Sequence, residues 1–331
     1  MFKKDPIQIV TFRSYGTANH LYAKGRSIQD EDIDLNQTGL FNLLRNSWKR
    51  FITDKVTNAK LTLTLPDNRT ISTITDSQGY FLIDETIENL LPLTDEEGWI
   101  TFSISFTENK SGRKIQQNNK FKGEILIPKN TAKYGVISDI DDTILHTGLT
   151  SRLKWAVIKN TFFKSADKRI PLKGAADFYQ KLHDGKSGSD CNPIFYVSHS
   201  PWNLYNYLEV FLEVNNFHKG PILLRDFVNP FAKKYKAEKP QKQTEIINIL
   251  DTYPKLPFIL IGDSGQHDPD IYKEITESNP GRILAIYLRD VNRRKKMERV
   301  KKLYKDYTRV PVLLVEDTEA AINHAKDQGF I

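Results

Sequence analysis

Cysteine is almost absent from this sequence, because Cys191 is the only one among 331 residues. A single thiol excludes an intramolecular disulfide and a thiolate metal cluster, and it fits a reducing compartment. No run of about 18 apolar residues occurs, and the apolar stretch near the N-terminus is too short and too interrupted for a signal peptide. We therefore expect a cytoplasmic protein whose chemistry rests on carboxylates, hydroxyls and lysines.

Internal repeats and low-complexity tracts are also absent, and the remaining composition is typical of a folded protein. The apolar fraction of 39% and the aromatic fraction of 11% argue against wholesale disorder. A length of 331 residues exceeds one ordinary domain, so two domains are expected. The net charge of +7 favours an anionic partner. This partner could be nucleic acid, an acidic membrane surface or a phosphorylated small molecule, and charge alone does not distinguish them.

The N-terminal part shows the alternation of half-buried β-strands. Leucine alternates with threonine over residues 61–65, and apolar residues alternate with serine or threonine over 100–106. Apolar residues recur at helical spacing over 40–48, which predicts one helix between strands. Residues 1–130 are therefore predicted to form a small antiparallel β-sandwich with a helical insertion.

In residues 131–331 the hydrophobic pattern changes to short apolar runs without polar alternation, as expected of strands that are covered on both faces. These runs are 136–137, 194–197, 258–261, 283–287 and 312–315. Helical patterns lie between or after them, around 175–182, 204–214, 242–250 and 319–326. This order predicts an α/β domain with a doubly wound parallel sheet, whose site lies beyond the carboxyl ends of the strands.

The first apolar run is followed by Asp139-Ile-Asp-Asp-Thr143. A loop leaving the strand can hold Asp139 and Asp141 around one site, where one carboxylate attacks phosphorus or binds a hard cation. The other can then donate a proton to the leaving oxygen and later activate water. The alternative is an acidic turn in which Asp142 or Thr143 caps a helix.

Two hydroxyls follow the second run, in Ser198-His-Ser-Pro-Trp202. Either hydroxyl could donate a hydrogen bond to a phosphoryl oxygen, and Ser198 is the better candidate because it directly follows the run. Taken alone, Ser200 and Pro201 are more typical of a helix N-cap followed by proline at the first helical position. His199 is interpreted as a loop histidine, since Asp141 is available as the acid and base.

A lysine and a second acidic loop complete the set. Lys242 begins the helix before the next strand, where its positive charge could offset the negative charge of the carboxylates and the phosphate. Lys239 is the alternative for this role. Taken alone, a lysine is most often a solvated surface charge. After run 258–261, Asp263 and Asp268 add oxygen ligands suited to Mg²⁺, although Gly-Asp alone would be a turn. No second histidine stands at ligand spacing from His267, which favours Mg²⁺ over a softer metal.

Taken in order on successive strands, these four pieces resemble the haloacid-dehalogenase (HAD) phosphatase superfamily. More narrowly, the domain resembles the catalytic domain of the actin-patch-associated phosphatidate phosphatase family. The narrower resemblance covers roughly residues 134–331 and rests on the strings at 138–144, 196–205, 223–227, 261–272 and 315–321. It implies a phosphoric monoester hydrolase that works through an aspartyl-phosphate, with phosphatidate as a candidate substrate.

The resemblance also implies residue roles. Asp139 would be the nucleophile and Asp141 the acid and base, with Lys242 neutralising charge. The implied Mg²⁺ ligands are Asp139, Asp141, Asp263 and Asp268, and the implied phosphate-binding groups are Thr143, Ser198, Ser200 and Lys242. His199 stands where a smaller or amide residue is expected, a departure that leaves these roles intact. Residues 75–81 resemble the transthyretin-like or carboxypeptidase-regulatory sandwiches.

Two basic segments bear on the substrate. Residues 152–169 mix basic and aromatic side chains where HAD proteins carry a cap, which suits an interfacial helix at anionic lipid; the alternative is a packed helix with solvated lysines. Residues 289–305 predict an exposed charged helix, and no recognised nucleic-acid motif accompanies them. The expected partner is thus a phosphorylated substrate, with peripheral membrane contact as an option and nucleic acid disfavoured. The sequence leaves protein partners open.

Three functions follow from these patterns. The first is a phosphatase acting on phosphatidate or a related lipid phosphate, and the second is the same chemistry on a soluble or protein phosphomonoester. The third is a basic lipid- or nucleic-acid-binding module with a vestigial site. The intact set of four aspartates and Lys242 counts against the third.

Overall fold

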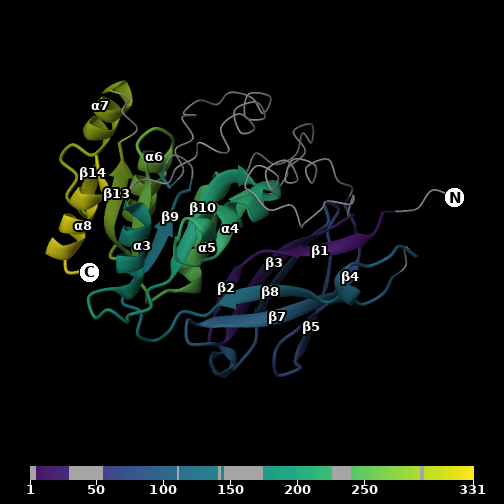
Figure 1. Ribbon diagram of the computed structural model, residues 1–331. Helices are drawn as coiled ribbons and strands as arrows, with labels where there is room; N and C mark the ends of the chain where they lie inside the picture. The colour runs from purple at the N-terminus through teal and green to yellow at the C-terminus, as the bar shows by residue number, and fades with distance from the viewer. Residues whose placement is uncertain are drawn as a thin grey trace. The chain divides into compact units, whose positions relative to one another are not determined.

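The computed structural model describes residues 5–29, 55–109, 112–140, 143–144, 174–225, 240–290 and 294–331. The chain divides into two compact units, Met1–Lys129 with Asn203–Asn206 and Asn130–Trp202 with Tyr207–Ile331. Figure 1 shows the strands of the first unit and the helices and strands of the second. The helix predicted over 40–48 and the basic segment 152–169 lie outside the described residues.

The first unit is a mixed, mostly antiparallel sheet. Its strands and short 3-10 helices are β1 (Ile7–Thr11), β2 (Ser14–Thr17), β3 (His20–Gln29), β4 (Lys60–Thr64), β5 (Thr70–Ile74), β6 (Tyr80–Thr86), η1 (Leu91–Leu93), β7 (Trp99–Phe106), η2 (Gln117–Asn119) and β8 (Phe121–Leu126). The strand order is β1-β3-β2-β8-β7-β4-β5, and β6 pairs with the other edge of β3. Only the pairing of β2 with β8 is parallel among these strands. A long connection separates these two strands, so no hairpin imposes the antiparallel direction that the sequence predicted.

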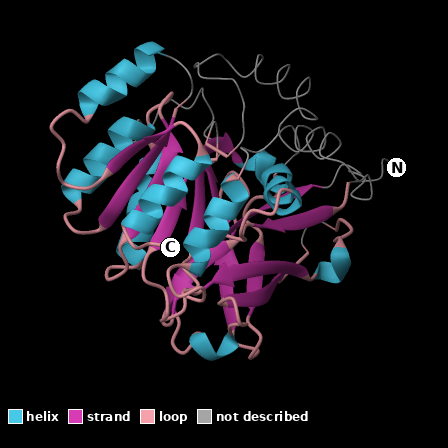
Figure 2. Ribbon diagram, turned by 60° about the vertical axis from the view of Figure 1, so that its left-hand side comes forward, coloured by secondary structure: helices cyan, strands magenta, loops and turns pink. Residues whose placement is uncertain are grey.

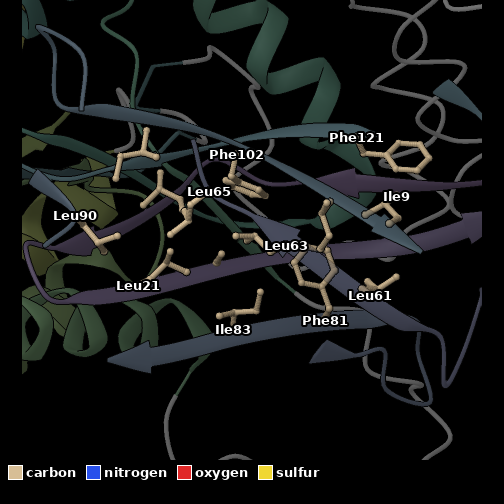
Figure 3. Close-up of a cluster of buried hydrophobic side chains, with 14 of the residues drawn as sticks. Ile9, Leu21, Leu61, Leu63, Leu65, Phe81, Ile83, Leu90, Phe102 and Phe121 are labelled. Carbon is tan, nitrogen blue, oxygen red and sulfur yellow. The ribbon is translucent and has the colours of Figure 1, made fainter. Parts of the chain in front are cut away.

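One apolar core lies inside this sheet (Figure 3). Leu63 of β4 and Phe81 of β6 belong to the same buried cluster, although their strands lie far apart in the strand order. The sheet must therefore curl so that its two ends face each other across the core, as in a sandwich. The alternation over 61–65 gives β4 one apolar face toward this core, because each leucine there is buried while the threonines are half-buried.

The second unit contains a six-stranded sheet in which every pair is parallel. Its strands are β9 (Gly135–Ser138), β10 (Ile194–Pro201), β11 (Ile222–Arg225), β12 (Phe258–Asp263), β13 (Ile283–Arg289) and β14 (Val312–Val315), in the order β11-β10-β9-β12-β13-β14. Each of the five predicted apolar runs lies in one of these strands. The α/β fold class is therefore confirmed, and only the short edge strand β11 was not predicted.

Helices cover both faces of this sheet (Figure 2). The helical elements described between residues 174 and 331 are α3 (Ala175–Asp184), η4 (Trp202–Leu204), α4 (Tyr205–Val214), α5 (Gln241–Thr252), α6 (Asp268–Ser278), α7 (Arg294–Leu303) and α8 (Thr318–Asp327). Helices α3 and α8 contact each other, and α5 contacts α6. The four predicted helical segments and the charged helix α7 are confirmed, whereas α6 was missed because its first residues were interpreted as part of a metal loop.

The strand order reverses at β9. From β9 the chain moves outward through β10 to β11, and it then returns to β12 on the other side of β9. In doubly wound sheets, the crevice for a ligand lies at such a point, beyond the carboxyl ends of the strands. Asp139 directly follows β9, and Asp263 is the last residue of β12. The topology therefore brings the predicted acidic residues to one edge.

Candidate active site

Asp139 begins the loop that leaves β9, and its side chain is buried. Its backbone N–H donates to the carbonyl of Ile261 in β12 at 2.8 Å, so the loop starts as a continuation of the sheet. The preceding Ser138 Oγ donates to the Asp139 carbonyl at 2.7 Å. These bonds fix the backbone at the point where the carboxylate is needed, which is how a rigid scaffold positions a reactive group.

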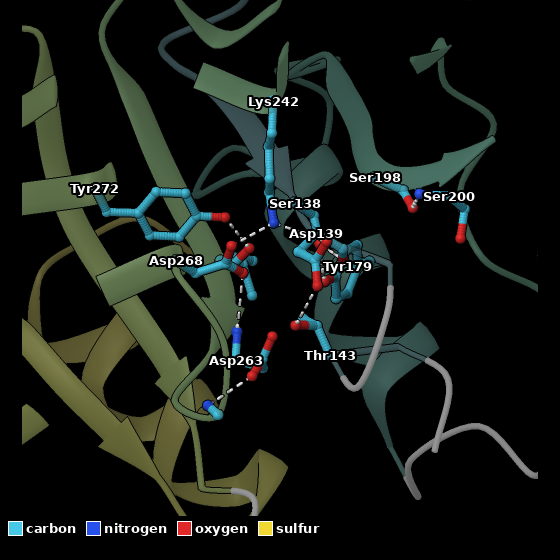
Figure 4. Close-up of polar contacts among 12 residues, drawn as sticks. Ser138, Asp139, Thr143, Tyr179, Ser198, Ser200, Lys242, Asp263, Asp268 and Tyr272 are labelled. Atoms are coloured by element: carbon cyan, nitrogen blue, oxygen red, sulfur yellow. Dashed lines mark hydrogen bonds and ion pairs between the residues drawn. The ribbon is translucent and has the colours of Figure 1, made fainter. Parts of the chain in front are cut away.

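Lys242 lies between two of the predicted aspartates (Figure 4). Its Nζ is 2.8 Å from Asp139 Oδ1 and 2.5 Å from Asp268 Oδ1, and all three side chains are buried. Burial alone would lower the pKa of Lys242, but the two carboxylates raise it above its usual value, so the ammonium stays charged. A buried charge requires such pairing.

The loop between β12 and α6 holds the other two carboxylates. Asp263 N–H donates to Asp268 Oδ2 at 3.2 Å, and Gly265 N–H donates to Asp263 Oδ1 at 2.6 Å. Gly262 is required here because an added Cβ would lie 2.5 Å from Asp268 Oδ2. Asp268 is also the first residue of α6, where the positive end of the helix dipole favours a carboxylate.

These contacts gather a group that could bind a metal ion. Carboxylate oxygens of Asp139, Asp263 and Asp268 lie within 4.8 Å of one another, and all three residues are buried. Oxygen donors of this kind suit a hard divalent cation such as Mg²⁺. Lys242 offsets only one of the three negative charges, so a divalent cation would neutralise the cluster. The donor set therefore fits the metal that the sequence predicted.

The predicted hydroxyl groups differ in how closely they approach this cluster. Thr143 Oγ1 is 3.3 Å from Asp139 Oδ2, a long hydrogen bond, and it is buried. Ser198 Oγ accepts a hydrogen bond from Ser200 N–H at 2.8 Å, and Figure 4 shows both serines to the right of Asp139. The helix N-cap interpretation of Ser200 is wrong. β10 continues through Pro201, with an irregular register against β11, so these serines lie in the end of the strand.

Asp141, the predicted acid and base, and Lys239, the alternative to Lys242, lie outside the described residues. His199 lies near the cluster, and burial together with the charge of Lys242 lowers its pKa to about 4. A histidine with that pKa is neutral at pH 7, so it has no proton to deliver as a general acid, and it is a weak base. The placement of His199 in a loop is wrong, because His199 lies in β10.

Two tyrosines support the site and were missed in the sequence. Tyr179 OH and Ser138 Oγ share a hydrogen bond of 2.5 Å, and Tyr272 OH donates to the Ile261 carbonyl at 2.9 Å. Burial raises the pKa of both tyrosines, so both stay protonated. Tyr179 of α3 thus contacts the end of β9, and Tyr272 of α6 contacts β12. No local pattern signals them, since Tyr179 is distant from Ser138 in the chain.

Comparisons with known proteins agree with this geometry. Residues 134–290 match the family model described as phosphatidate phosphatase APP1, catalytic domain. The chain is 30% identical over 266 residues to phosphatidate phosphatase APP1 of Saccharomyces cerevisiae, covering 79% of this chain and 41% of that protein. It is 25% identical over 218 residues to an uncharacterized protein of Schizosaccharomyces pombe, covering 66% of this chain and 34% of that protein.

This chain therefore spans less than half the length of either relative. Among solved structures, a match to a 1.5-MDa bacterial ice-binding adhesin covers 38% of this chain and 32% of that one, at 12% identity and a TM-score of 0.20. That similarity is too low to support an argument. The resemblance predicted from the sequence is confirmed by the family match over residues 134–290.

Proposed function

We propose that this protein is a Mg²⁺-dependent phosphatase acting on phosphatidate or a related lipid phosphate, because residues 134–290 match the family model described as phosphatidate phosphatase APP1, catalytic domain. The observation that supports this most directly is the buried group of three aspartates, two of which pair with Lys242. Residues 131–331 would form the phosphatase domain, and residues 1–130 a transthyretin-like domain.

In the proposed reaction, the Asp139 carboxylate attacks phosphorus and forms an aspartyl-phosphate. The bond from phosphorus to the alcohol oxygen of the substrate breaks, and that oxygen takes a proton from Asp141. Asp141 then accepts a proton from the water that hydrolyses the aspartyl-phosphate, which returns Asp139 to a carboxylate and Asp141 to its protonated form and releases inorganic phosphate.

Lys242 has two roles in this scheme. It holds Asp139 Oδ1 at 2.8 Å, which fixes the orientation of the nucleophile, and its charge offsets the negative charge that the phosphoryl group brings. The hydroxyls of Ser198, Ser200 and Thr143 would donate to phosphoryl oxygens. Mg²⁺ held by Asp139, Asp141, Asp263 and Asp268 would supply further positive charge next to those oxygens.

The lipid substrate is proposed from the family that the domain matches. None of the helices in the described part of the chain combines the length and the hydropathy that a membrane crossing requires. A soluble or protein phosphomonoester remains the second candidate, because the proposed chemistry of the aspartates acts on the phosphoryl group and not on the alcohol attached to it. A binding module with a vestigial site is disfavoured, since Asp139, Lys242, Asp263 and Asp268 are all present and in contact.

A substrate panel tests the proposal. Phosphatidate in vesicles and soluble phosphomonoesters such as para-nitrophenyl phosphate would be assayed with Mg²⁺ and with EDTA. We expect release of inorganic phosphate from phosphatidate that depends on Mg²⁺ and stops in EDTA. Turnover of soluble esters without any turnover of phosphatidate would support the second candidate. Absence of phosphate release from every ester with Mg²⁺ present would contradict phosphatase function.

Exchanging Asp263 for asparagine should remove most of the effect of Mg²⁺ on stability. A ligand at 100 times its dissociation constant stabilises the folded state by about 2.7 kcal/mol, which raises the melting temperature of a domain of 150–250 residues by roughly 5–10 °C. We expect a shift of this size in the wild type and a much smaller one in Asp263→Asn, measured by thermal melting with and without Mg²⁺.

The matched control is Asp251→Asn, which removes an exposed carboxylate at the end of α5. Its Mg²⁺ shift should equal that of the wild type. Identical shifts in the wild type and in Asp263→Asn would place the ion elsewhere.

A further inference from the structure

Helix α7 carries an excess of positive charge that the proposed reaction does not use. Its ten residues, Arg-Lys-Lys-Met-Glu-Arg-Val-Lys-Lys-Leu from position 294, include six basic side chains and one acidic one. Figure 1 shows α7 beside α6, and the two helices are in contact. Six like charges on one short helix repel one another, so a partner of opposite charge would be bound favourably there.

One face of α7 is attached to the metal loop and to α6. Lys296 Nζ donates to the carbonyl of Gly265, and Arg299 donates to the carbonyl of Gln266 at 3.3 Å. Arg299 also holds both carboxylate oxygens of Asp270 at 2.9 Å. The carbonyls belong to the loop between Asp263 and Asp268, so this face of the helix lies next to the proposed metal ligands.

The other face of α7 is exposed and basic. At about 100° per residue, Arg294, Lys295, Lys301 and Lys302 fall on the side opposite the buried Val300, and all four are exposed. Glu298, the one acid of the helix, lies on the same side and pairs with Arg294 at 2.9 Å. In the described part of the chain, Lys295, Lys301 and Lys302 have no ion pair. This set of three lysines with Arg294 is the outward face of α7.

We propose that the outward face of α7 is the surface by which this protein docks on an anionic phospholipid bilayer. The charge of the face complements the headgroups, and no apolar side chain on it suggests insertion, so the contact is electrostatic adsorption. The inference rests on the proposed function in one respect: a lipid substrate is itself part of such a bilayer. Docking through α7 places the bilayer at the sheet edge that carries Asp139, Asp263 and Asp268.

The position of the face favours a bilayer over nucleic acid. The residues that anchor α7 touch the loop of the proposed catalytic group, so a bilayer docked on α7 would lie close to that loop. Nucleic acid offers phosphodiesters along its chain, whereas the proposed reaction uses a phosphomonoester. A lipid surface therefore accounts for both the charge and the place of α7.

Vesicle binding tests this proposal without requiring turnover. The full chain would be sedimented with phosphatidylcholine vesicles that contain phosphatidylglycerol, a phosphodiester that the proposed reaction does not hydrolyse. We expect binding that weakens as salt is raised, because screening shortens the reach of exposed charge. The triple variant K295E/K301E/K302E should bind on the order of 100-fold more weakly or worse, since each basic residue near the surface contributes separately.

The matched control reverses three exposed lysines of the same unit, in the variant K186E/K255E/K326E. These lysines lie in or just after the C-terminal ends of α3, α5 and α8, at the other edge of the parallel sheet. Both triple variants lower the net charge by the same amount, so retained vesicle binding in the control assigns the effect to α7. Equal loss in both variants would overturn that assignment.

Hydrolysis of para-nitrophenyl phosphate separates this proposal from the proposed function. All three proteins should hydrolyse it equally, which also shows that the α7 variant is folded. A wild type that hydrolyses nothing yet binds vesicles through α7 would contradict the phosphatase and keep the docking surface. Failure of the wild type to bind anionic vesicles would overturn the docking surface. Tighter α7-dependent binding to duplex DNA than to vesicles would also overturn it.

Discussion

Replacing Asp139 with asparagine is expected to lower kcat on para-nitrophenyl phosphate by about 10⁴-fold or more, the scale seen when a catalytic nucleophile is removed. Asparagine has nearly the shape of aspartate, but its amide does not attack phosphorus. Lys242 also lies 2.5 Å from Asp268, and the change does not touch that ion pair, so the cluster should retain one of its two ion pairs. The loss should therefore appear in turnover while the protein stays folded.

Asp251→Asn serves as the control for Asp139→Asn, because it makes the same chemical change on an exposed helix end. Beryllium fluoride with Mg²⁺ should attach a phosphate mimic to Asp139 in the wild type. Attachment to Ser198 or His199, or turnover in Asp139→Asn close to that of the wild type, would refute Asp139 as the nucleophile.

Replacing Lys242 with methionine is expected to impair both stability and activity. The change leaves Asp139 and Asp268 buried without the cation between them, and removal of one partner of a buried pair costs about 3–5 kcal/mol. For a unit of 150–250 residues this corresponds to a fall in melting temperature of roughly 6–20 °C. Turnover should fall as well, since the oriented positive charge is lost.

Mg²⁺ should raise the melting temperature of Lys242→Met more than that of the wild type, because the variant has three buried carboxylates and no ammonium. Lys255→Met, at an exposed lysine, should melt like the wild type. A Lys242→Met protein with unchanged melting temperature would show that Lys242 does not hold the carboxylates together. Full activity in that variant would exclude Lys242 from the reaction.

The parallel sheet could be predicted from sequence because its strands have an unusual pattern. All six residues of β12 are buried. A strand that is covered on both faces lacks the polar alternation of a half-exposed strand, so its sequence pattern is distinctive. Asp139 and Asp263 could be placed for the same reason, since each marks the point where a buried run ends. The strand order then follows from the topology of doubly wound folds.

Other parts of the site had no local signal. Lys242 and Lys239 are three positions apart in sequence, and only the structure gives Lys242 its contacts with Asp139 and Asp268. The pair of Ser138 and Tyr179 joins two elements through one hydrogen bond, which no periodicity encodes. Asp268 was predicted as a ligand but not as the start of a helix, because aspartate followed by proline fits a loop as well as a first helical turn.

The contacts of Lys242 also bear on how the protein reaches its active form. Asp139 follows the first strand of the parallel sheet, whereas Asp268 comes after the fourth, and the lysine that joins them lies between them in the chain. Contacts so distant in sequence form only after large loops have closed, which makes folding slow. A chain still emerging from the ribosome therefore holds no partial version of the site. The group of three aspartates is complete only once β12 lies beside β9.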